Sequence, residues 1–548
     1  MWLGVLWAAI FALAVSGYPN LLDNERRVGG YVMDVIQNGH WIIQHDVTGD
    51  IASKPPLLTW IAAASALCTG GVNRFSIYLP SALGTLGVAW LLFAIGRKHF
   101  TWGTGFIAAL TYLLSYVADK QVVTARYDGV FAFPVALAAM AAYRAWTTGR
   151  GWTNFWLACA LATMVKGPLG IVLAGSGLLA AFWEARSGNR VPLRGSHWLG
   201  ILLYLVICGG WFALAYKELG EGLVEKLFGK ELMAHAVKDG EHLPGQGFWE
   251  PVWNTFTNFF PWSIAAGAGL WAVIRRPASD IEERRFERFL FCWIVVSMIL
   301  FSIAAHQRGR LAWPLVPALA LLGARQMDRW LKNVSPKQWL RAAAALSIFV
   351  LAFFFVYHHL LLKRSRSAQK TLGMKQLATE IRTRAGKEFP VTYVDAPYAV
   401  QFYLNTLRRN ASFKQSAAVL RSDAPAFVLV QDYERLLYEL GTNIPVHDVL
   451  AWPQTGEPFV RLVSNREKLE PMNDVEACIG PLRLRLEHAQ LESVRADEFT
   501  VVPKDKNALV IFQNTSSNTM TVLLRWSADS RMTLHQLRAG ESWQSKAP

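Results

Sequence analysis

Apolar residues along this chain gather into long runs that are separated by short polar stretches. A helix needs about 20 mostly apolar residues to cross the hydrocarbon core of a bilayer, and many of the runs approach that length. The pattern therefore predicts a helical membrane protein with several crossings. The predicted spans cover residues 1–18, 77–96, 104–118, 130–146, 153–165, 168–184, 198–216, 257–275, 289–305, 311–327 and 340–362.

Two apolar runs need separate treatment. Run 1–18 has no basic residue ahead of it and no convincing small-residue cleavage site, so we expect a retained anchor rather than a signal peptide. Run 56–71, which begins at the Pro55-Pro56 pair, is apolar but short. We interpret it as an interfacial or re-entrant helix, with a twelfth span as the alternative. The predicted fold class is an α-helical polytopic bundle of about 11–13 transmembrane helices.

Basic residues concentrate in alternate loops between these spans. Such loops face the cytoplasm in membrane proteins. The long connections 19–76 and 217–256 and the tail from 363 onward then face the exoplasm, which is the periplasm if the membrane is a bacterial inner membrane. The residues that set this orientation are Arg97, Lys98, Arg150, Arg186, Arg190, Arg194, Arg275, Arg276, Arg284, Arg285, Arg288, Arg325, Arg329, Lys332 and Lys337.

The chain changes to a mixed polar composition at about residue 363. Apolar strands at 391–394 and 426–430, with a helical stretch at 371–385, predict a soluble α/β domain over 363–475. Alternating strands separated by Asn, Ser and Gly turns predict a small β-sandwich over 476–548. Residues 1–362 are expected to form the transmembrane domain.

Composition narrows the function classes. Hydrophobic residues make up 53% of the chain and charged residues only 17%, against about 25% in soluble proteins, which excludes a single soluble domain and a disordered chain. The net charge of +15 is explained by orientation and anionic lipid, so we expect no nucleic-acid partner. The five cysteines show no metal or disulfide spacing, and neither a phosphate-binding GxxxxGK[ST] loop nor HExxH occurs.

Ionisable residues beside apolar sequence on the exoplasmic side are the candidate functional residues. A charge near a bilayer is costly unless it pairs with another group or has a function. Asp23 precedes and Glu25 begins an amphipathic helix over 25–39, although an ordinary helix start would also use them. Lys54 stands before Pro55-Pro56, where an ammonium suits a phosphate; a snorkelling lysine is the alternative. Arg126 and Asp128 open the next span and could simply pair with each other.

Further cations lie at the same predicted face. Lys166 in Lys166-Gly167-Pro168 interrupts a long apolar stretch and predicts a helical hairpin with a buried cation at its tip. Arg308 and Arg310 occupy a tight loop on the side where orientation charge is not expected. In loop 217–256, His and Glu residues match no metal-ligand template, so we interpret them as solvated charge and predict no metal site.

An ordered set of short motifs resembles the polyprenyl-phosphate-dependent glycosyltransferases of the GT-C fold, in particular the lipid A aminoarabinose transferases and the protein O-mannosyltransferase-like group. Together the motifs cover most of residues 20–330. They are Asp23–Arg26, Asn38–Trp41, Ser53–Trp60, Leu79–Leu83, Ala125–Asp128, Val165–Pro168, Phe260–Trp262 and Phe301–Ser302 with Pro314 and Pro317.

The resemblance implies transfer of a sugar from an isoprenoid phosphate to an exoplasmic hydroxyl or phosphate, usually with inversion. It implies that Asp23 or Glu25 acts as base or orients the acceptor and that Asp128 helps to orient the acceptor or the catalytic loop. Fixed cations would stabilise the departing phosphate. No cofactor is required by this chemistry, while a divalent cation held by loop acids stays open. The cations implied for donor binding are Lys54, Arg126, Lys166, Arg308 and Arg310.

The sequence departs from the family pattern at a few positions. Asn24 stands where the family has the Asp of an Asp-Glu pair, and Gln307 and Leu311 replace a Lys and a Tyr. Two other function classes stay open beside the glycosyltransferase. A non-catalytic polyprenyl-phosphate-binding or assembly subunit would keep the fold without the reaction, and a secondary transporter would need polar residues near the bilayer midplane.

Overall fold

The structure, a computed structural model, describes most of the chain, and its described residues form two compact units. Unit 1 contains Met1–Pro19, His40–Gln44 and Ile51–Ser365, and unit 2 contains Asn20–Gly39, His45–Asp50 and Arg366–Pro548. The described residues are 1–16, 26–46, 50–122, 125–226, 247–304, 309–364, 368, 373–385, 391–404, 410–422, 426–441, 446–453, 457–466, 474–479, 482–487, 489–495, 498–503, 508–516, 519–526 and 532–546.

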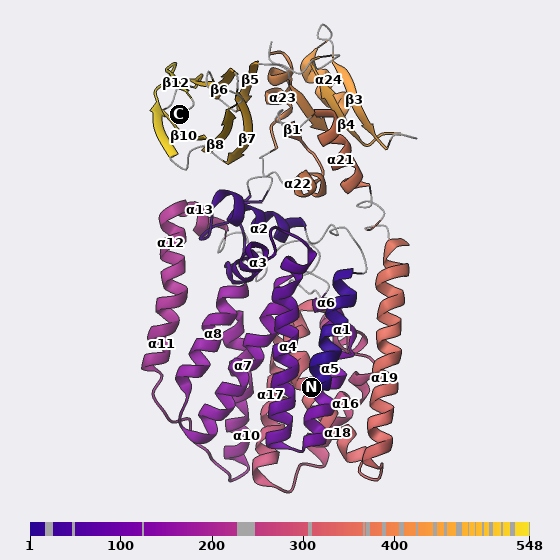
Figure 1. Cartoon of the computed structure of the whole chain (residues 1–548). Coiled ribbons are helices and arrows are strands. Elements are labelled where there is room, and N and C mark those ends of the chain that lie inside the picture. The colour runs from indigo at the N-terminus through magenta and orange to yellow at the C-terminus, as the bar shows by residue number, and fades with distance from the viewer. Residues whose placement is uncertain are drawn as a thin grey trace. The chain divides into compact units, whose positions relative to one another are not determined.

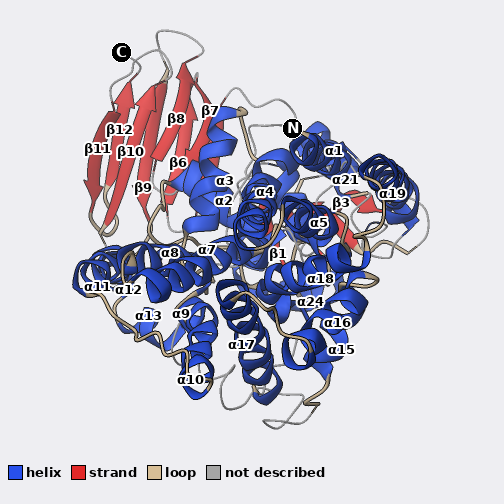
Figure 2. Cartoon of the chain, turned by 90° about the horizontal axis from the view of Figure 1, so that it is seen from below, coloured by secondary structure: helices blue, strands red, loops and turns tan. Residues whose placement is uncertain are grey.

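Unit 1 is a bundle of helices (Figures 1 and 2). Its helices are α1 (Trp2–Ser16), α3 (Leu57–Cys68), α4 (Arg74–His99), α5 (Trp102–Leu113), α6 (Tyr116–Val122), α7 (Tyr127–Thr148), α8 (Trp152–Lys166), α9 (Leu169–Gly175), η1 (Ser176–Leu179), α10 (Ala180–Arg186), α11 (Trp198–Tyr204), η2 (Leu205–Gly209), α12 (Gly210–Leu219), α13 (Glu221–Val224), α15 (Glu250–Asn258), α16 (Trp262–Arg275), α17 (Ile281–Ile303), η4 (Gly309–Leu315), α18 (Val316–Trp330), α19 (Pro336–Val356), η5 (Tyr357–Leu361) and η6 (Leu362–Arg364).

Six helices among the described residues are long and apolar enough to cross a membrane. The remaining predicted spans coincide with α1, α5, α8, α16 and α18, which have 12 to 15 residues each. The run 56–71 is the 12-residue α3. The six long helices are Arg74–His99, Tyr127–Thr148, Leu169–Arg186, Trp198–Leu219, Ile281–Ile303 and Lys337–Arg364.

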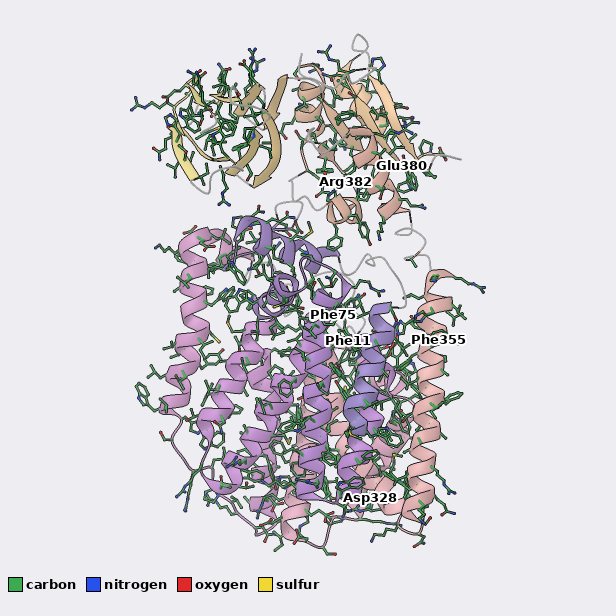
Figure 3. All side chains as sticks on the ribbon, in the orientation of Figure 1. Phe11, Phe75, Asp328, Phe355, Glu380 and Arg382 are labelled. Carbon is green, nitrogen blue, oxygen red and sulfur yellow. The ribbon has the colours of Figure 1, made fainter. Side chains whose placement is uncertain are left out.

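Small residues let the helices of unit 1 approach closely. A Cβ on Gly84 of α4 would lie 2.6 Å from the carbonyl oxygen of Gly129 in α7, and one on Gly96 would lie 2.5 Å from the Cα of Gly105 in α5. Such contacts are typical of helix packing in lipid, where backbones gain dispersion energy by close approach. Aromatic packing adds to this, since Phe11 of α1 lies 5.4 Å from Phe75 of α4, ring centre to ring centre (Figure 3).

Several arginines that the sequence assigned to orientation also hold helices together. Arg288 of α17 donates to Glu184 of α10 over 2.6 Å, and Arg329 of α18 donates to Glu287 of α17 over 2.7 Å. Because both carboxylates are buried, each pair compensates a charge that would otherwise be costly. These basic residues therefore fix the helix packing as well as the predicted orientation.

Unit 2 contains a sheet flanked by helices. Strands β1 (Val391–Val394) and β2 (Phe427–Val430) pair in parallel, and the helices between them supply the crossover connection that parallel pairing requires. The sheet order is β1-β2-β4-β3, with β3 (His447–Trp452) and β4 (Val460–Ser464). Both β1 and β2 fall at the predicted strands. The helices of this part are α2 (Arg26–Asn38), α21 (Met374–Ala385), α22 (Tyr398–Leu404), α23 (Phe413–Leu420) and α24 (Tyr433–Leu440).

The end of the chain forms two sheets, each of four described strands, with orders β11-β10-β8-β7 and β12-β9-β6-β5. Inward residues of both sheets, such as Leu484, Phe499, Phe512 and Leu524, share one buried core, which is a sandwich arrangement. The domain boundaries predicted at 363 and 476 stay predictions. The strands are β5 (Asp474–Ile479), β6 (Leu482–Glu487), β7 (Ala489–Arg495), β8 (Glu498–Pro503), β9 (Leu509–Asn514), β10 (Met520–Trp526), β11 (Met532–Leu537) and β12 (Ser542–Lys546).

Candidate functional site

Asp128 lies buried in the first turn of α7. The chain enters this helix through Arg126, whose extended backbone forms the N-cap and whose carbonyl oxygen accepts a hydrogen bond from Ser81 Oγ of α4 over 3.3 Å. The close approach of Gly84 and Gly129 brings α4 against the same turn. Asp128 is therefore held by the packing of two long helices.

Lys166 is the last residue of α8 and pairs with Asp128 through Nζ and Oδ1. The next residue, Gly167, ends the helix with a φ of +96°, a conformation that side chains disfavour, and Pro168 leads into α9. The ammonium also lies 5.5 Å from the ring centre of Phe131. The predicted hairpin with a cation at its tip is thus present, and its cation faces a carboxylate.

Arg310 reaches the same carboxylate from a distant part of the chain. It belongs to η4, and its Nε lies 3.8 Å from Asp128 Oδ2. The short helix packs against α7, α15 and α17, which fixes it beside the start of α7. Asp128, Lys166 and Arg310, named the Asp128 cluster below, therefore come together from three helices.

The Asp128 cluster carries two cations and one carboxylate. The side chains of Lys166 and Arg310 are 15% and 30% exposed, whereas that of Asp128 is 7% exposed. One positive charge therefore remains uncompensated within the cluster, beside solvent-accessible edges of both cations. Fixed cations in such a place suit a phosphate or another anion.

Two of the other predicted site residues, Lys54 and Arg126, lie within the part of the chain that the structure describes. Lys54 is partly buried in the segment directly before Pro55, Pro56 and α3. Arg126 is the N-cap of α7, as described above. Asp23, Glu25 and Arg308 lie outside the described residues, so their roles stay predictions.

The predicted first-loop helix is present as α2 in unit 2. Asp34 is buried and accepts hydrogen bonds from the backbone N–H of His45 and from Asn38 Nδ2, both over 2.6 Å. Arg27 donates to Asp50 over 2.8 Å. Partial burial alone would lower the pKa of Arg27, but Tyr31 and the neighbouring carboxylates outweigh it and raise that pKa. Polar contacts therefore brace the helix that follows the candidate acids.

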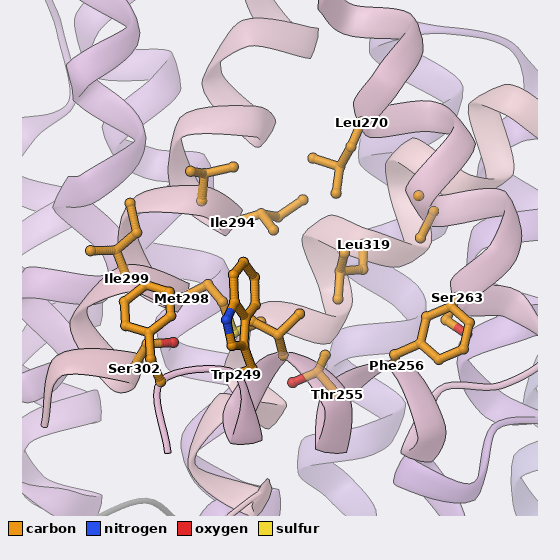
Figure 4. A pocket seen from close by; sticks show the side chains of 15 residues that line it. Trp249, Thr255, Phe256, Ser263, Leu270, Ile294, Met298, Ile299, Ser302 and Leu319 are labelled. Atoms are coloured by element: carbon orange, nitrogen blue, oxygen red, sulfur yellow. The ribbon is translucent and has the colours of Figure 1, made fainter. Parts of the chain in front are cut away.

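An apolar cavity of about 430 Å³ lies between α15, α16, α17 and α18 (Figure 4). Its wall is almost entirely hydrocarbon and aromatic, so it suits an apolar chain. The short helix η4, which carries Arg310, packs against α15 and α17. These two helices also line the cavity. Lining residues include Trp249, Phe256, Leu270, Ile294, Met298, Ile299 and Leu319.

Sequence reasoning missed a second buried group of charges. Asp119 of α6 pairs with His358 of η5 over 2.8 Å, and the adjacent Lys120 donates to Tyr357 Oη over 2.8 Å. The available signals were an Asp-Lys pair directly after the predicted span 104–118 and two histidines inside the last apolar run. Ionisable residues within a predicted span are by themselves a reason to look for partners.

Comparison with known proteins identifies related folds. A family model described as dolichyl-phosphate-mannose-protein mannosyltransferase matches residues 53–212, a stretch that includes Lys54, Asp128 and Lys166. The chain is 25% identical over 344 residues to an undecaprenyl phosphate-alpha-4-amino-4-deoxy-L-arabinose arabinosyl transferase of Pectobacterium atrosepticum, covering 61% of this chain and 59% of the relative. A transferase of the same name from Proteus mirabilis is 24% identical, with 59% of each chain covered. The matched region thus spans about three fifths of these relatives.

The solved structure of ArnT from Cupriavidus metallidurans bound to undecaprenyl phosphate superimposes with a TM-score of 0.66. The sequences are 17% identical, and the match covers 86% of this chain and 98% of ArnT. The predicted fold class, a helical polytopic GT-C-like bundle with a C-terminal α/β and β-rich region, is confirmed. The predicted resemblance to the aminoarabinose-transferase type is confirmed as well.

Proposed function

We propose that this chain is an integral-membrane glycosyltransferase that moves a sugar from a polyprenyl-phosphate donor to an exoplasmic acceptor. The observation that carries the proposal is the Asp128 cluster, whose two fixed cations leave a positive charge for an anion. The similarity to named arabinosyl transferases supports the same reaction class. The relatives' aminoarabinose is one sugar of this class, and the cluster would bind the phosphate that all such donors share.

In the proposed reaction an acceptor oxygen attacks the anomeric carbon of the sugar. The bond between that carbon and the phosphate oxygen breaks, and its electron pair leaves with the polyprenyl phosphate. The acceptor proton passes to a carboxylate, for which Asp23 and Glu25 are the sequence candidates. Lys166 and Arg310 stabilise the charge that grows on the departing phosphate, and Asp128 keeps their head groups in place.

The apolar cavity is the proposed place for isoprenoid units of the donor. Filling it should raise the donor KM by about tenfold, which corresponds to about 1.4 kcal/mol of lost binding. Gly267→Phe is suited to this test because a Cβ on Gly267, which lines the cavity, meets no atom within 4 Å. Kinetics in proteoliposomes with a fixed acceptor would measure the change.

Gly210→Phe is the matched control, since Gly210 is also a helical glycine with open space around its Cβ but lies in α12, outside the cavity. It should leave the donor KM unchanged. A donor KM that is equal in Gly267→Phe and the parent protein would contradict isoprenoid binding in this cavity.

We place the protein in the inner membrane with loops 19–76 and 217–256 and its C-terminal region in the periplasm, following the distribution of basic residues. Single cysteines introduced at Asn189 and at Glu434 in a background without the native cysteines should test this. A membrane-impermeant thiol reagent applied to intact spheroplasts should label position 434 and leave 189 unlabelled until the membrane is opened. Labelling of 189 alone would reverse the topology.

The defining experiment is transfer by the purified chain in proteoliposomes supplied with cell-extracted polyprenyl-phosphate sugars. Mass spectrometry of envelope lipids, glycans and proteins should reveal an acceptor that gains one sugar mass. We expect transfer to persist in EDTA, because protein cations neutralise the phosphate in the proposed chemistry. Binding of undecaprenyl phosphate without any transfer, across all extracts, would contradict the enzyme and favour a non-catalytic lipid-phosphate binder.

A further inference from the structure

Two consecutive residues of α6 pair with two consecutive residues of η5. Asp119 Oδ1 lies 2.8 Å from His358 Nε2, and Lys120 Nζ donates to Tyr357 Oη over 2.8 Å. Asp119 and His358 are both almost completely buried. These four residues, named the α6 clamp, join parts of the chain that are 239 and 237 positions apart.

The α6 clamp is more costly than simple packing would require. Burying an ionisable pair forfeits hydration, and an apolar pair of similar volume would often hold two helices at least as well. Two further features set the contact apart: the helix widens into a π-turn over η5, and His358 Nδ1 has no partner among the described residues. We therefore ask which part of the bundle this buried pair holds in position.

The geometry that α6 controls is the start of α7. Helix α6 ends at Val122, and its Gln121 carbonyl oxygen would lie 3.1 Å from a Cβ on Gly129, the residue after Asp128. Helix α6 also packs against α4 and α5, so it forms one wall of the turn that carries Asp128. A shift of α6 would therefore move Asp128 against Lys166.

We propose that the residues of the α6 clamp, above all Asp119 and His358, are positioning residues for the Asp128 cluster. Through the clamp, helix α19 and its continuation η5 set the orientation of Lys166 and Arg310. The proposal rests on the proposed function, because it assigns the α6 clamp a role in the same transfer. Loss of the clamp leaves both cations present but less well aligned with the phosphate in the transition state. The rate of transfer then falls while binding of the lipid phosphate in the ground state is kept.

His358→Leu tests this in proteoliposomes, with kcat from the transfer assay and the affinity for undecaprenyl phosphate from a separate binding titration. We expect kcat to fall about tenfold and the affinity to stay within about twofold. His358→Gln should recover most of kcat, because its amide nitrogen can donate near the position of Nε2. The matched control is His359→Leu, because the neighbouring ring stacks on Phe355 and faces Ser16 of α1 instead of pairing with Asp119. This variant should leave kcat unchanged.

A double-mutant comparison separates positioning from general loosening. Asp128→Asn alone should lower kcat about 100-fold, and adding His358→Leu should lower it no further if His358 acts through Asp128. The proposal would be overturned if the kcat losses of the two single variants multiplied in the double variant. It would also be overturned if His358→Leu lost affinity and kcat equally, or if it kept full activity.

Should His358→Leu fail to fold, Tyr357→Phe removes only the hydroxyl that accepts from Lys120. It should lower kcat by a few-fold with unchanged affinity, and an unchanged kcat would overturn the proposal. Wild-type protein that transfers no sugar contradicts the proposed function itself. If wild-type protein transfers sugar and the clamp variants are equally fast, the positioning role of the α6 clamp is contradicted and the proposed function stands.

Discussion

Lys166→Met should lower the rate of sugar transfer by at least about 100-fold, the usual cost of losing one fixed donor to a developing negative charge. The ammonium is held on Asp128 at the end of α8, and methionine keeps much of the side-chain length without the charge. Initial rates at saturating donor and acceptor would measure the loss, with thermal unfolding in detergent to confirm that the protein is folded.

Two companion variants sharpen this experiment. Lys166→Arg keeps the charge and should retain more activity than Lys166→Met. Lys217→Met removes an exposed cation from the last turn of α12 and should behave like the parent protein. If Lys166→Met were as active as Lys217→Met, the cation would serve only to balance Asp128, and the phosphate site would have to be sought elsewhere.

Asp23→Asn should also lower the rate of sugar transfer, by about 100-fold or more, because it removes the carboxylate proposed to take the acceptor's proton. Asparagine keeps the size of the side chain and cannot take that proton. We expect the affinity for undecaprenyl phosphate to be unchanged, since the cations are untouched. For this variant the transfer assay should therefore show a loss of rate, while the binding titration should show an unchanged affinity.

The neighbouring Asn24 provides a rescue test, because the family pattern has an acid at that position. The double variant Asp23→Asn with Asn24→Asp should recover activity if one acid in this stretch is sufficient. Full activity of Asp23→Asn alone would assign the base to Glu25 or Asp128. A wild-type protein that binds the lipid phosphate but transfers nothing would make Asn24 the reason for a non-catalytic role.

Local patterns in the sequence were sufficient for the course of the chain through the bundle. Helices lie at the predicted apolar runs, because an apolar run is a property of neighbouring residues. Helix α3 begins directly after Pro55-Pro56, and the Lys166-Gly167-Pro168 break separates α8 from α9. The strands at Val391–Val394 and Phe427–Val430 were likewise readable from short buried runs. Helix lengths were less readable, because where a helix ends depends on packing as well as on hydropathy.

Partner choice could be read only from the tertiary structure. The sequence left Asp128 free to pair with Arg126, its neighbour, whereas the fold brings Lys166 and Arg310 to its two oxygens. The arginines Arg288 and Arg329 looked like orientation charge until packing placed buried carboxylates against them.

The sequence by itself determined the polytopic helical fold class and the glycosyltransferase type that the chain resembles, while the face that carries the candidate chemistry stays a prediction. Only the tertiary structure decided which charges meet, and it alone revealed the pair of Asp119 and His358 across 239 residues. The physical reason is one of range. Hydropathy acts residue by residue along a helix, while the pairing of buried charges is set by how distant helices pack.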